Sequence, residues 1–212
     1  FDEGVYSSAL ISTVGSRVAA TFNAETGAKI DLSGASDTYS QLIASGRYVD
    51  QLQWSNGGRL ALGNGGTITG AAIDAHGGAA AARGGTLEML APTLVATDPA
   101  IATANTVSAA QVAAAGFDDF TAFGSLAGGE GDVTLKLRGN FLLTSRAFDG
   151  ATDAFDGYLP AVSSLGNLAV EASHVTFSSL LQTAASPLVG TPGLGTASFS
   201  ANSIDVNGAV LF

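Results

Sequence analysis

The sequence predicts an all-β protein built as a stack of β coils, and two observations lead to this prediction. Four segments begin at a glycine, place apolar residues at every second position, turn a corner and add a second apolar run. They begin at Gly85, Gly131, Gly166 and Gly195. Such alternation is typical of strands with one face in a core and one in water. The starts lie 46, 35 and 29 residues apart, a spacing typical of solenoid repeats.

The apolar positions of the four copies define the inward face that we predict. They are Leu87, Met89, Ala91 and Leu94; then Val133, Leu135, Leu137, Phe141 and Leu143; then Leu168, Val170, Ala172, Val175 and Phe177; and finally Ala197, Phe199, Ala201, Ile204 and Val206. The residues between them are mostly polar, such as Glu88 and Lys136. We therefore expect the four copies to stack as equivalent coils around a continuous apolar core.

The earlier part of the chain has the same rhythm in a less regular form. Alternating runs predict strands within residues 9–14 and 18–22, a short strand over 28–34, and a further coil over 58–73. The tract 76–85 is almost entirely Gly and Ala, which indicates a loop or a tightly packed corner.

Larger side chains gather in residues 37–54, where the alternation is loosest. This stretch contains Tyr39, Tyr48 and Trp54. We interpret the tryptophan and the tyrosines as core or corner side chains rather than as platforms for sugar rings.

One stretch departs from the β pattern and predicts a short helix near residues 108–115. Ser108 and Gln111 have the spacing of a capping box, and Gly116 stands where a helix often ends. We expect this helix to lie in an insertion near 100–116, as a decoration or cover on one side of the stack. Two further insertions are predicted near 144–165 and 180–194, where glycines and prolines interrupt the alternation.

Composition and charge exclude several classes of function. The chain is 46% hydrophobic, with 28 glycines and no cysteine, so its fold does not depend on disulfides. Its net charge of −10 makes nucleic acid and anionic membrane surfaces unsuitable partners. The chain begins without Met and ends within an alternating run, so we expect residues 1–212 to be a single segment of a larger protein.

Four stretches carry a recognisable pattern: residues 28–34, 115–123 with 131–135, 166–172 and 195–206. These stretches resemble segments of the filamentous haemagglutinin-like exoproteins of bacteria. The resemblance implies a right-handed parallel β-helix, or β solenoid, from a very large surface protein. Because the Asn-Pro motifs of that family's secretion domain are missing here, the chain resembles an internal or distal segment.

The resemblance also implies a function, a location and partners. The family serves in adhesion, aggregation and the building of biofilm, and its members are secreted to the cell surface, where they associate with the outer membrane. The parent protein would pass through a dedicated outer-membrane transporter of a two-partner secretion system. Polysaccharides or receptors on host or bacterial surfaces are the expected ligands, and open coil edges predict end-to-end self-association.

Two other functions stay open at this level: a polysaccharide-active β-helix enzyme, and a passive stalk for a contact-dependent toxin. An enzyme would need clustered carboxylates, and the candidates are Asp149, Asp153 and Asp156, with Tyr158 beside them. We assign these four residues as candidate ligands of a glycan or of calcium, with acidic residues in glycine turns as the alternative. Their spacing differs from that of an EF-hand.

No catalytic residue, metal site or cofactor is assigned from the remaining residues. Asp118 and Asp119 are adjacent, so on a regular strand they would point to opposite faces, and we expect them to shape the turn after the helix. His76 and His174 occur in unrelated contexts, and His174 is expected at an exposed corner. We therefore expect a protein that is not an enzyme.

Overall fold

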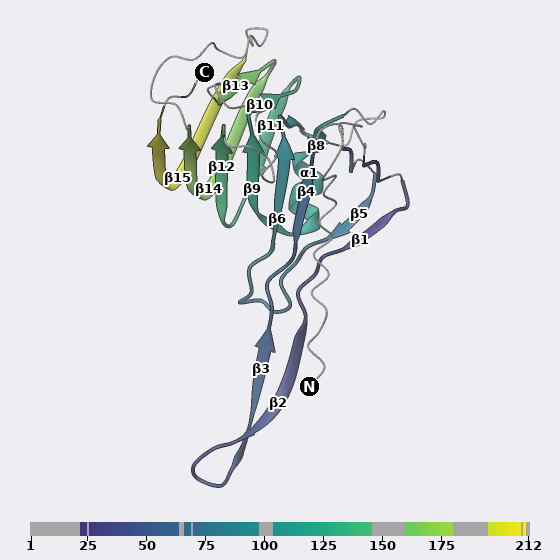
Figure 1. The fold of residues 1–212 in the computed structure, drawn as a ribbon, viewed down its shortest axis with the longest axis vertical. Helices are drawn as coiled ribbons and strands as arrows, with labels where there is room; N and C mark the ends of the chain where they lie inside the picture. The colour runs from purple at the N-terminus through teal and green to yellow at the C-terminus, as the bar shows by residue number, and fades with distance from the viewer. Residues whose placement is uncertain are drawn as a thin grey trace, which may run out of the picture.

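The computed structural model describes residues 22–24, 26–63, 66–68, 70–97, 104–145, 160–179, 195–208 and 210 (Figure 1). The largest element is a curled parallel sheet of seven strands, which lie side by side in the sheet. Its strands are β4 (Arg59–Leu62), β6 (Gly85–Leu90), β9 (Phe117–Phe123), β12 (Asn140–Thr144), β14 (Asn167–Ser178), β11 (Asp132–Lys136) and β15 (Thr196–Asn207). The long strand β14 pairs with β11 through its first half and with β12 through its second half.

A second parallel sheet shares the apolar core of the first. It consists of β8 (Thr106–Ser108), β7 (Thr93–Val95), β10 (Ser125–Gly128) and β13 (Ala161–Ser164). The chain passes from β6 to β7, and later from β9 to β10, so it moves between the two sheets as it advances. The all-β prediction is confirmed, with one short helix among the described residues.

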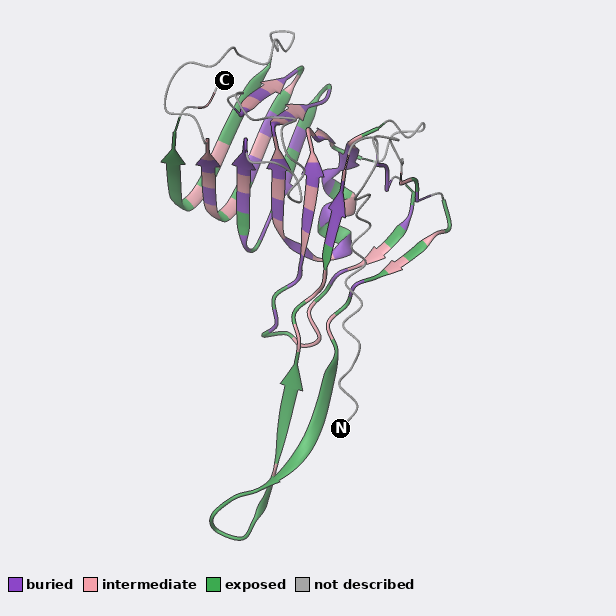
Figure 2. Ribbon diagram, viewed as in Figure 1, coloured by how far each residue is buried: buried purple, intermediate pink, exposed green. Residues whose placement is uncertain are grey.

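Two in-register lines of apolar side chains run across the main sheet, and we call them the apolar ladders. The first contains Leu60, Leu87, Phe120, Phe141, Val175 and Ile204. The second contains Leu62, Met89, Ala122, Leu143, Phe177 and Val206. The rings of Phe120 and Phe141 stack with their centroids 6.1 Å apart. Ladder members from β4 to β14 are buried, so the core continues from one strand to the next (Figure 2).

The predicted inward face is confirmed in the first three copies. The buried residues are Leu87, Met89 and Leu94, then Val133 and Leu135, and then Leu168 and Val170. The prediction that the first copy stacks directly on the second as an equivalent coil is wrong. Strand β6 pairs with β9, and the register places Leu87 beside Phe120 rather than beside Val133. The helix and a switch between sheets lie between these strands, so the spacing between glycines did not reveal which strands become neighbours.

The first copy departs from the predicted inward pattern at its corner, and the apolar residues of the fourth copy are less buried than those of the others. Ala91 is half-buried with a φ of 43°, because the chain turns there between β6 and β7. Ile204 and Val206 keep their places in the ladders but are 46% and 60% exposed. The reason is their position on β15, which pairs with β14 alone among the described strands.

Helix α1 (Ala109–Ala115) forms where the sequence predicts it. The Ser108 hydroxyl accepts a hydrogen bond from the backbone N–H of Gln111, and Gly116 ends the helix with a φ of 79°. The second half of the predicted capping box is wrong, because the Gln111 amide donates to the carbonyls of Ile68 and Ala71 instead. The helix buries Ala109, Val112 and Ala115 in the core. Of the two predicted roles, the structure therefore agrees with a cover over the core, and the role of a decoration is wrong.

A long antiparallel hairpin projects away from the sheets and has almost no buried residue (Figures 1 and 2). It consists of β2 (Ser36–Leu42) and β3 (Tyr48–Trp54). Tyr39, Tyr48 and Trp54 are exposed here, so the prediction that they fill the core or a corner is wrong. A coil would have buried them against neighbouring coils, whereas each hairpin strand pairs only with the other.

The remaining described segments qualify the predicted insertions. Strands β8 and β13 lie within the predicted insertions 100–116 and 144–165 and belong to the second sheet, so those predictions were too broad. Residues 180–194, the predicted strand within 9–14, and all but the last residue of the predicted strand within 18–22 are outside the described residues. The predicted strand in 28–34 is β1 (Lys29–Asp31), which pairs in parallel with β5 (Ala72–Asp74). Within the described segments, no helix has the length and apolar character required to cross a membrane.

Candidate site at the stacked corner

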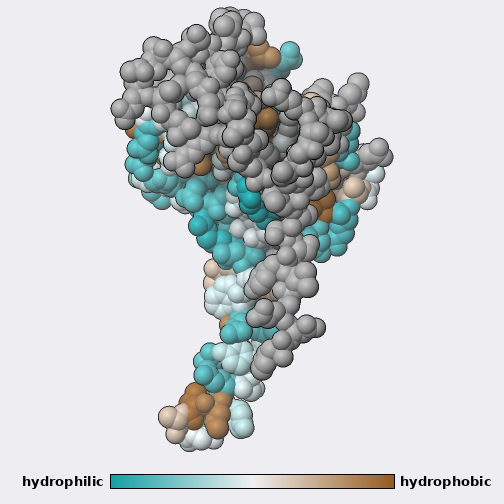
Figure 3. Space-filling model, viewed as in Figure 1, coloured by the Kyte–Doolittle hydropathy of each residue, from teal (hydrophilic) through white to brown (hydrophobic). Residues whose placement is uncertain are grey.

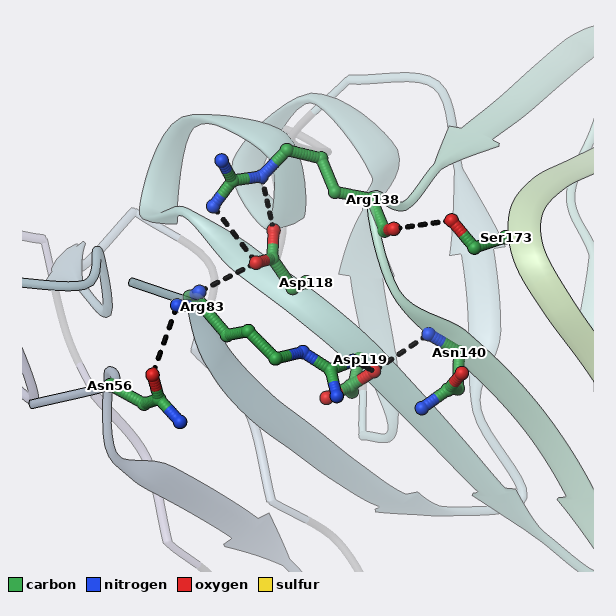
Figure 4. A network of polar contacts seen from close by, with 8 residues as sticks. Asn56, Arg83, Asp118, Asp119, Arg138, Asn140 and Ser173 are labelled. Atoms are coloured by element: carbon green, nitrogen blue, oxygen red, sulfur yellow. Dashed lines mark hydrogen bonds and ion pairs between the residues drawn. The ribbon is translucent and has the colours of Figure 1, made fainter. Parts of the chain in front are cut away.

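A network of polar contacts begins at an irregularity in strand β9. Gly85 pairs with Phe117, and the next residue, Thr86, pairs with Asp119, so Asp118 has no opposite residue in this ladder. Such a bulge redirects side chains that a regular strand would send to opposite faces. It brings Asp118 and Asp119 to the same corner of the stack, where each meets an arginine (Figure 4).

Asp118 is held by three donors. Arg138 donates from Nε to Oδ1 at 2.7 Å and from Nη2 to Oδ2 at 2.8 Å, which is a two-point contact between two planar groups. The backbone N–H of Gly84 donates to Oδ2 at 2.5 Å. Asp118 is only 5% exposed, so these partners replace the water that the carboxylate loses on burial.

Asp119 connects a different pair of neighbours. Arg83 donates from Nη2 to its Oδ1 at 2.7 Å, and the backbone N–H of Asn140 donates to the same oxygen at 2.6 Å. Because Arg83 precedes β6 and Asn140 begins β12, this carboxylate links β9 to the strands on both of its sides.

Two further hydrogen bonds extend the network along the stack. The backbone N–H of Arg83 donates to Oδ1 of Asn56 at 3.0 Å, and the Ser173 hydroxyl donates to the carbonyl of Arg138 at 2.6 Å. The connected residues therefore come from five successive passes of the chain across the main sheet. These are the passes that contain β4, β6, β9, β12 and β14. We call the network of Asn56, Arg83, Asp118, Asp119, Arg138, Asn140 and Ser173 the corner brace (Figure 4).

The charged and hydrogen-bonding neighbours of Asp118 in the corner brace keep its carboxyl group ionised. Burial on its own would raise the pKa of Asp118, but the hydrogen bonds from Arg138 and Gly84 and the positive charges of Arg138 and Arg83 outweigh it, so the pKa lies below its ordinary value of 3.8. The same pair raises the pKa of Arg138. Near neutral pH the carboxylate is therefore ionised and its oxygens are engaged, which suits a structural link better than proton transfer.

Glycines permit the close approach of backbone that the brace requires. A Cβ on Gly84 would lie 1.9 Å from the carbonyl oxygen of Gly116, and one on Gly139 would lie 2.3 Å from Oδ1 of Asp119. The predicted tight corner in 76–85 is confirmed by this packing. A hollow of about 460 Å³ adjoins the brace, lined by the Gly/Ala tract, the end of α1 and the side chains of Lys136 and Arg138.

The four residues proposed as ligands of a glycan or of calcium lie outside the described residues: Asp149, Asp153, Asp156 and Tyr158. Their assignment stays a prediction. Within the described part of the chain, no group of three or more His, Cys, Asp or Glu side chains is placed to hold a metal ion.

The two histidines are each beside an acidic residue on the surface. His76 Nδ1 lies 2.9 Å from Oδ1 of Asp74, and His174 Nε2 lies 3.2 Å from Oδ2 of Asp205. His174 Nδ1 also contacts the Ser203 hydroxyl. The two sites belong to different sheets, which agrees with the unrelated contexts that the sequence indicates.

Sequence reasoning placed Asp118 and Asp119 near the turn after the helix but missed both of their arginine partners. The signal that was present is the dipeptide Arg-Gly, which occurs at 83–84 and at 138–139, each time just before a strand of the main sheet. Only the pairing of β6, β9 and β12 shows that these two corners adjoin the same two acids.

Comparison of the chain with family models, with curated proteins and with solved structures found no match in any of the three.

Proposed function

We propose that this chain is a segment of a right-handed parallel β-helix in a large secreted bacterial exoprotein of the filamentous haemagglutinin-like kind. In this role it forms part of a stiff rod that supports adhesion, aggregation or the building of biofilm at the cell surface. The parent protein would reach that surface through an outer-membrane transporter of the two-partner type.

The continuous apolar ladders are the observation that carries the proposal. From β4 to β14 every pass of the main sheet adds one buried rung to each ladder, and β15 adds a rung whose side chains stay partly exposed. Stability then arises mainly between neighbouring passes, as in solenoid proteins, and each pass lengthens the stack by about 4.8 Å. Repetition of this kind produces length and stiffness.

The corner brace supports the same mechanical role. Its hydrogen bonds and ion pairs run from one pass of the chain to the next, so they resist separation of the strands along the stack. Its ionised carboxylate is enclosed by donors rather than presented to a substrate.

One experiment with the full chain distinguishes an adhesive function from an enzymatic one. Beads coated with the protein are incubated with bacterial cells, host cells and a panel of bacterial and host polysaccharides, and adherence, retention and newly released sugar ends are measured together. We expect adherence or retention without release of sugar ends. Release of sugar ends would contradict the proposal in favour of an enzyme, and complete absence of adherence and retention would leave a stalk without adhesive function.

A further inference from the structure

The β2–β3 hairpin has two chemically different faces. Residues directly opposite each other in an antiparallel pair share a face, and alternate residues along a strand do so as well. The pairs Leu42 with Tyr48, Thr38 with Leu52, and Ser36 with Trp54 therefore place their large apolar side chains on one face. The opposite face carries the pairs Gln41 with Val49, Tyr39 with Gln51, and Asp37 with Gln53. We call the first the aromatic face.

The aromatic face is open along its length. Tyr48 is 71% exposed and Trp54 is 46% exposed, while Leu42 and Leu52 are exposed between and beside them. Hydrophobic residues also gather at the tip of the hairpin in Figure 3. An isolated two-stranded hairpin is of marginal stability in water, so keeping several apolar side chains exposed on it calls for a reason beyond folding.

Polar groups stand between the apolar ones on the same face. The Ser40 hydroxyl donates to Asp50 Oδ1 midway along the hairpin, and Thr38 lies beside Leu52. Tyr48 and Trp54 are six residues apart on β3, which places them about 20 Å from each other. Two aromatic rings with hydroxyl and carboxylate groups between them form a narrow strip in which apolar and hydrogen-bonding surfaces alternate.

The size of the strip decides between the candidate occupants. Each strand has seven residues, so the face is about 23 Å long and, with two strands, about 10 Å wide. A strip only two strands wide does not offer the broad surface, with a buried centre and a polar rim, that packing against a second folded copy requires. One extended sugar chain matches its length and width.

Charge restricts the class of polysaccharide that the aromatic face can bind. The chain carries a net charge of −10, and the charged side chain that β2 and β3 place on the aromatic face is the carboxylate of Asp50. An anionic polysaccharide would be repelled by both, while a neutral one would offer hydroxyl donors to Asp50. The apolar face of a sugar ring stacks on an aromatic ring, and Tyr48 and Trp54 present two such rings.

We propose that the aromatic face of the β2–β3 hairpin binds a single neutral polysaccharide chain along its length. Tyr48 and Trp54 stack on sugar rings near the two ends of the strip, and Asp50 and Thr38 accept or donate hydrogen bonds to sugar hydroxyls between them. This inference rests on the proposed adhesive function and names its ligand class. The hairpin projects from the sheets, so a bound chain would lie clear of the stack (Figure 1).

Trp54 is the single tryptophan of the chain and serves as a direct reporter. The intact protein is titrated with neutral linear hexasaccharides of glucose, of mannose and of N-acetylglucosamine, and with hexagalacturonate as the anionic comparison. We expect at least one neutral hexasaccharide to shift the Trp54 emission, and hexagalacturonate to bind at least about tenfold more weakly. The same ligands are measured by calorimetry, which also reads variants without tryptophan.

The two faces of the hairpin supply a matched control. Tyr48→Ala and Trp54→Ala should each weaken binding at least about tenfold, because each removes a stacking surface. Tyr39→Ala removes an exposed tyrosine from the opposite face and should leave the affinity within about twofold. Equal loss in Tyr39→Ala, preference for hexagalacturonate, or no binding of any neutral hexasaccharide would overturn this proposal.

Failure of this proposal can be told from failure of the proposed function. The hairpin variants leave the ladders and the corner brace intact, so cell adherence that persists in Tyr48→Ala and Trp54→Ala would contradict the ligand assignment alone. If the unchanged protein itself showed no adherence to cells, that result would instead contradict the adhesive function.

Discussion

Strands β9 and β2 are each seven residues long, yet one is largely enclosed and the other is exposed throughout. Strand β9 has parallel neighbours on both sides, β6 and β12, and adds Phe120 and Ala122 to the two ladders. Strand β2 pairs only with β3, at a distance from the sheets (Figure 1). The comparison teaches that the same extended backbone is stabilised in two ways, by stacking against successive passes in the body and by cross-strand pairs alone in the hairpin.

The largest effect should follow from a charge placed inside the stack. Leu135 is fully buried and pairs with Val170 on β14, so Leu135→Asp puts a carboxylate among apolar side chains without a partner. We expect loss of soluble folded protein, measured by expression yield and circular dichroism. Thr134→Asp, on the exposed side of the same strand, is the control and should fold normally. Native-like spectra for Leu135→Asp would show that the assigned inward face is wrong.

The next largest difference should lie between an interior member of the first ladder and the member at its end on β15. Phe141 is fully buried between β9 and β14, and Phe141→Ala should lower the free energy of unfolding by about 3–5 kcal/mol. Ile204 belongs to the same ladder but is 46% exposed, so Ile204→Ala should cost less than about 2 kcal/mol. Urea unfolding of both variants checks this, and equal losses would mean that β15 is covered as fully as β12.

The corner brace should have an intermediate effect. Asp118→Asn removes the negative charge that holds Arg138 and disturbs the bond from the Gly84 amide, so we expect a loss of about 1–3 kcal/mol in the free energy of unfolding. Asp132→Asn is the matched control, because Asp132 is exposed on the outer side of β11 and bonds to Asn167. A loss no larger than that of the control would show that the brace contributes nothing to stability.

Acid should remove the contribution of Asp118 specifically. Its pKa in the folded protein lies below the ordinary value of 3.8, so its stabilisation is present above that value and is lost as the pH falls through the folded pKa. The difference in unfolding free energy between the unchanged protein and Asp118→Asn should therefore shrink between about pH 5 and about pH 2. A difference that stays constant over this range would contradict the ionic character of the brace.

The smallest effect should occur in the hairpin. Leu52→Asp introduces the same carboxylate as Leu135→Asp, but Leu52 is exposed on β3, so the global free energy of unfolding should change by less than about 0.5 kcal/mol. Urea unfolding followed by far-ultraviolet circular dichroism measures the change. A loss comparable with that of Phe141→Ala would mean that the hairpin unfolds together with the body.

Several features of the candidate site could be anticipated from local patterns, and others could not. The Ser108 cap and the end of α1 at Gly116 depend on residues close together in sequence, and the structure confirms them. The Gly/Ala composition of 76–85 predicts tight packing, but the residues that pack there, such as Gly116 against Gly84, are distant in sequence. The contact of Arg83 and Arg138 with the two aspartates depends on which strands become neighbours. The bulge at Asp118 also overrides the simple alternation that would separate adjacent side chains.

The sequence by itself determined the strands of the four copies and the short strands β1 and β4, the side that faces the core in the first three copies, and the position of the single described helix. These follow from the period of two along a strand and from capping chemistry, which act within a few residues. Tertiary structure alone decided that β6 stacks on β9, that residues 36–54 leave the stack as a hairpin, and that two arginines meet at one corner. Register between distant strands depends on the packing of whole passes against one another, and no short-range pattern in this chain specifies it.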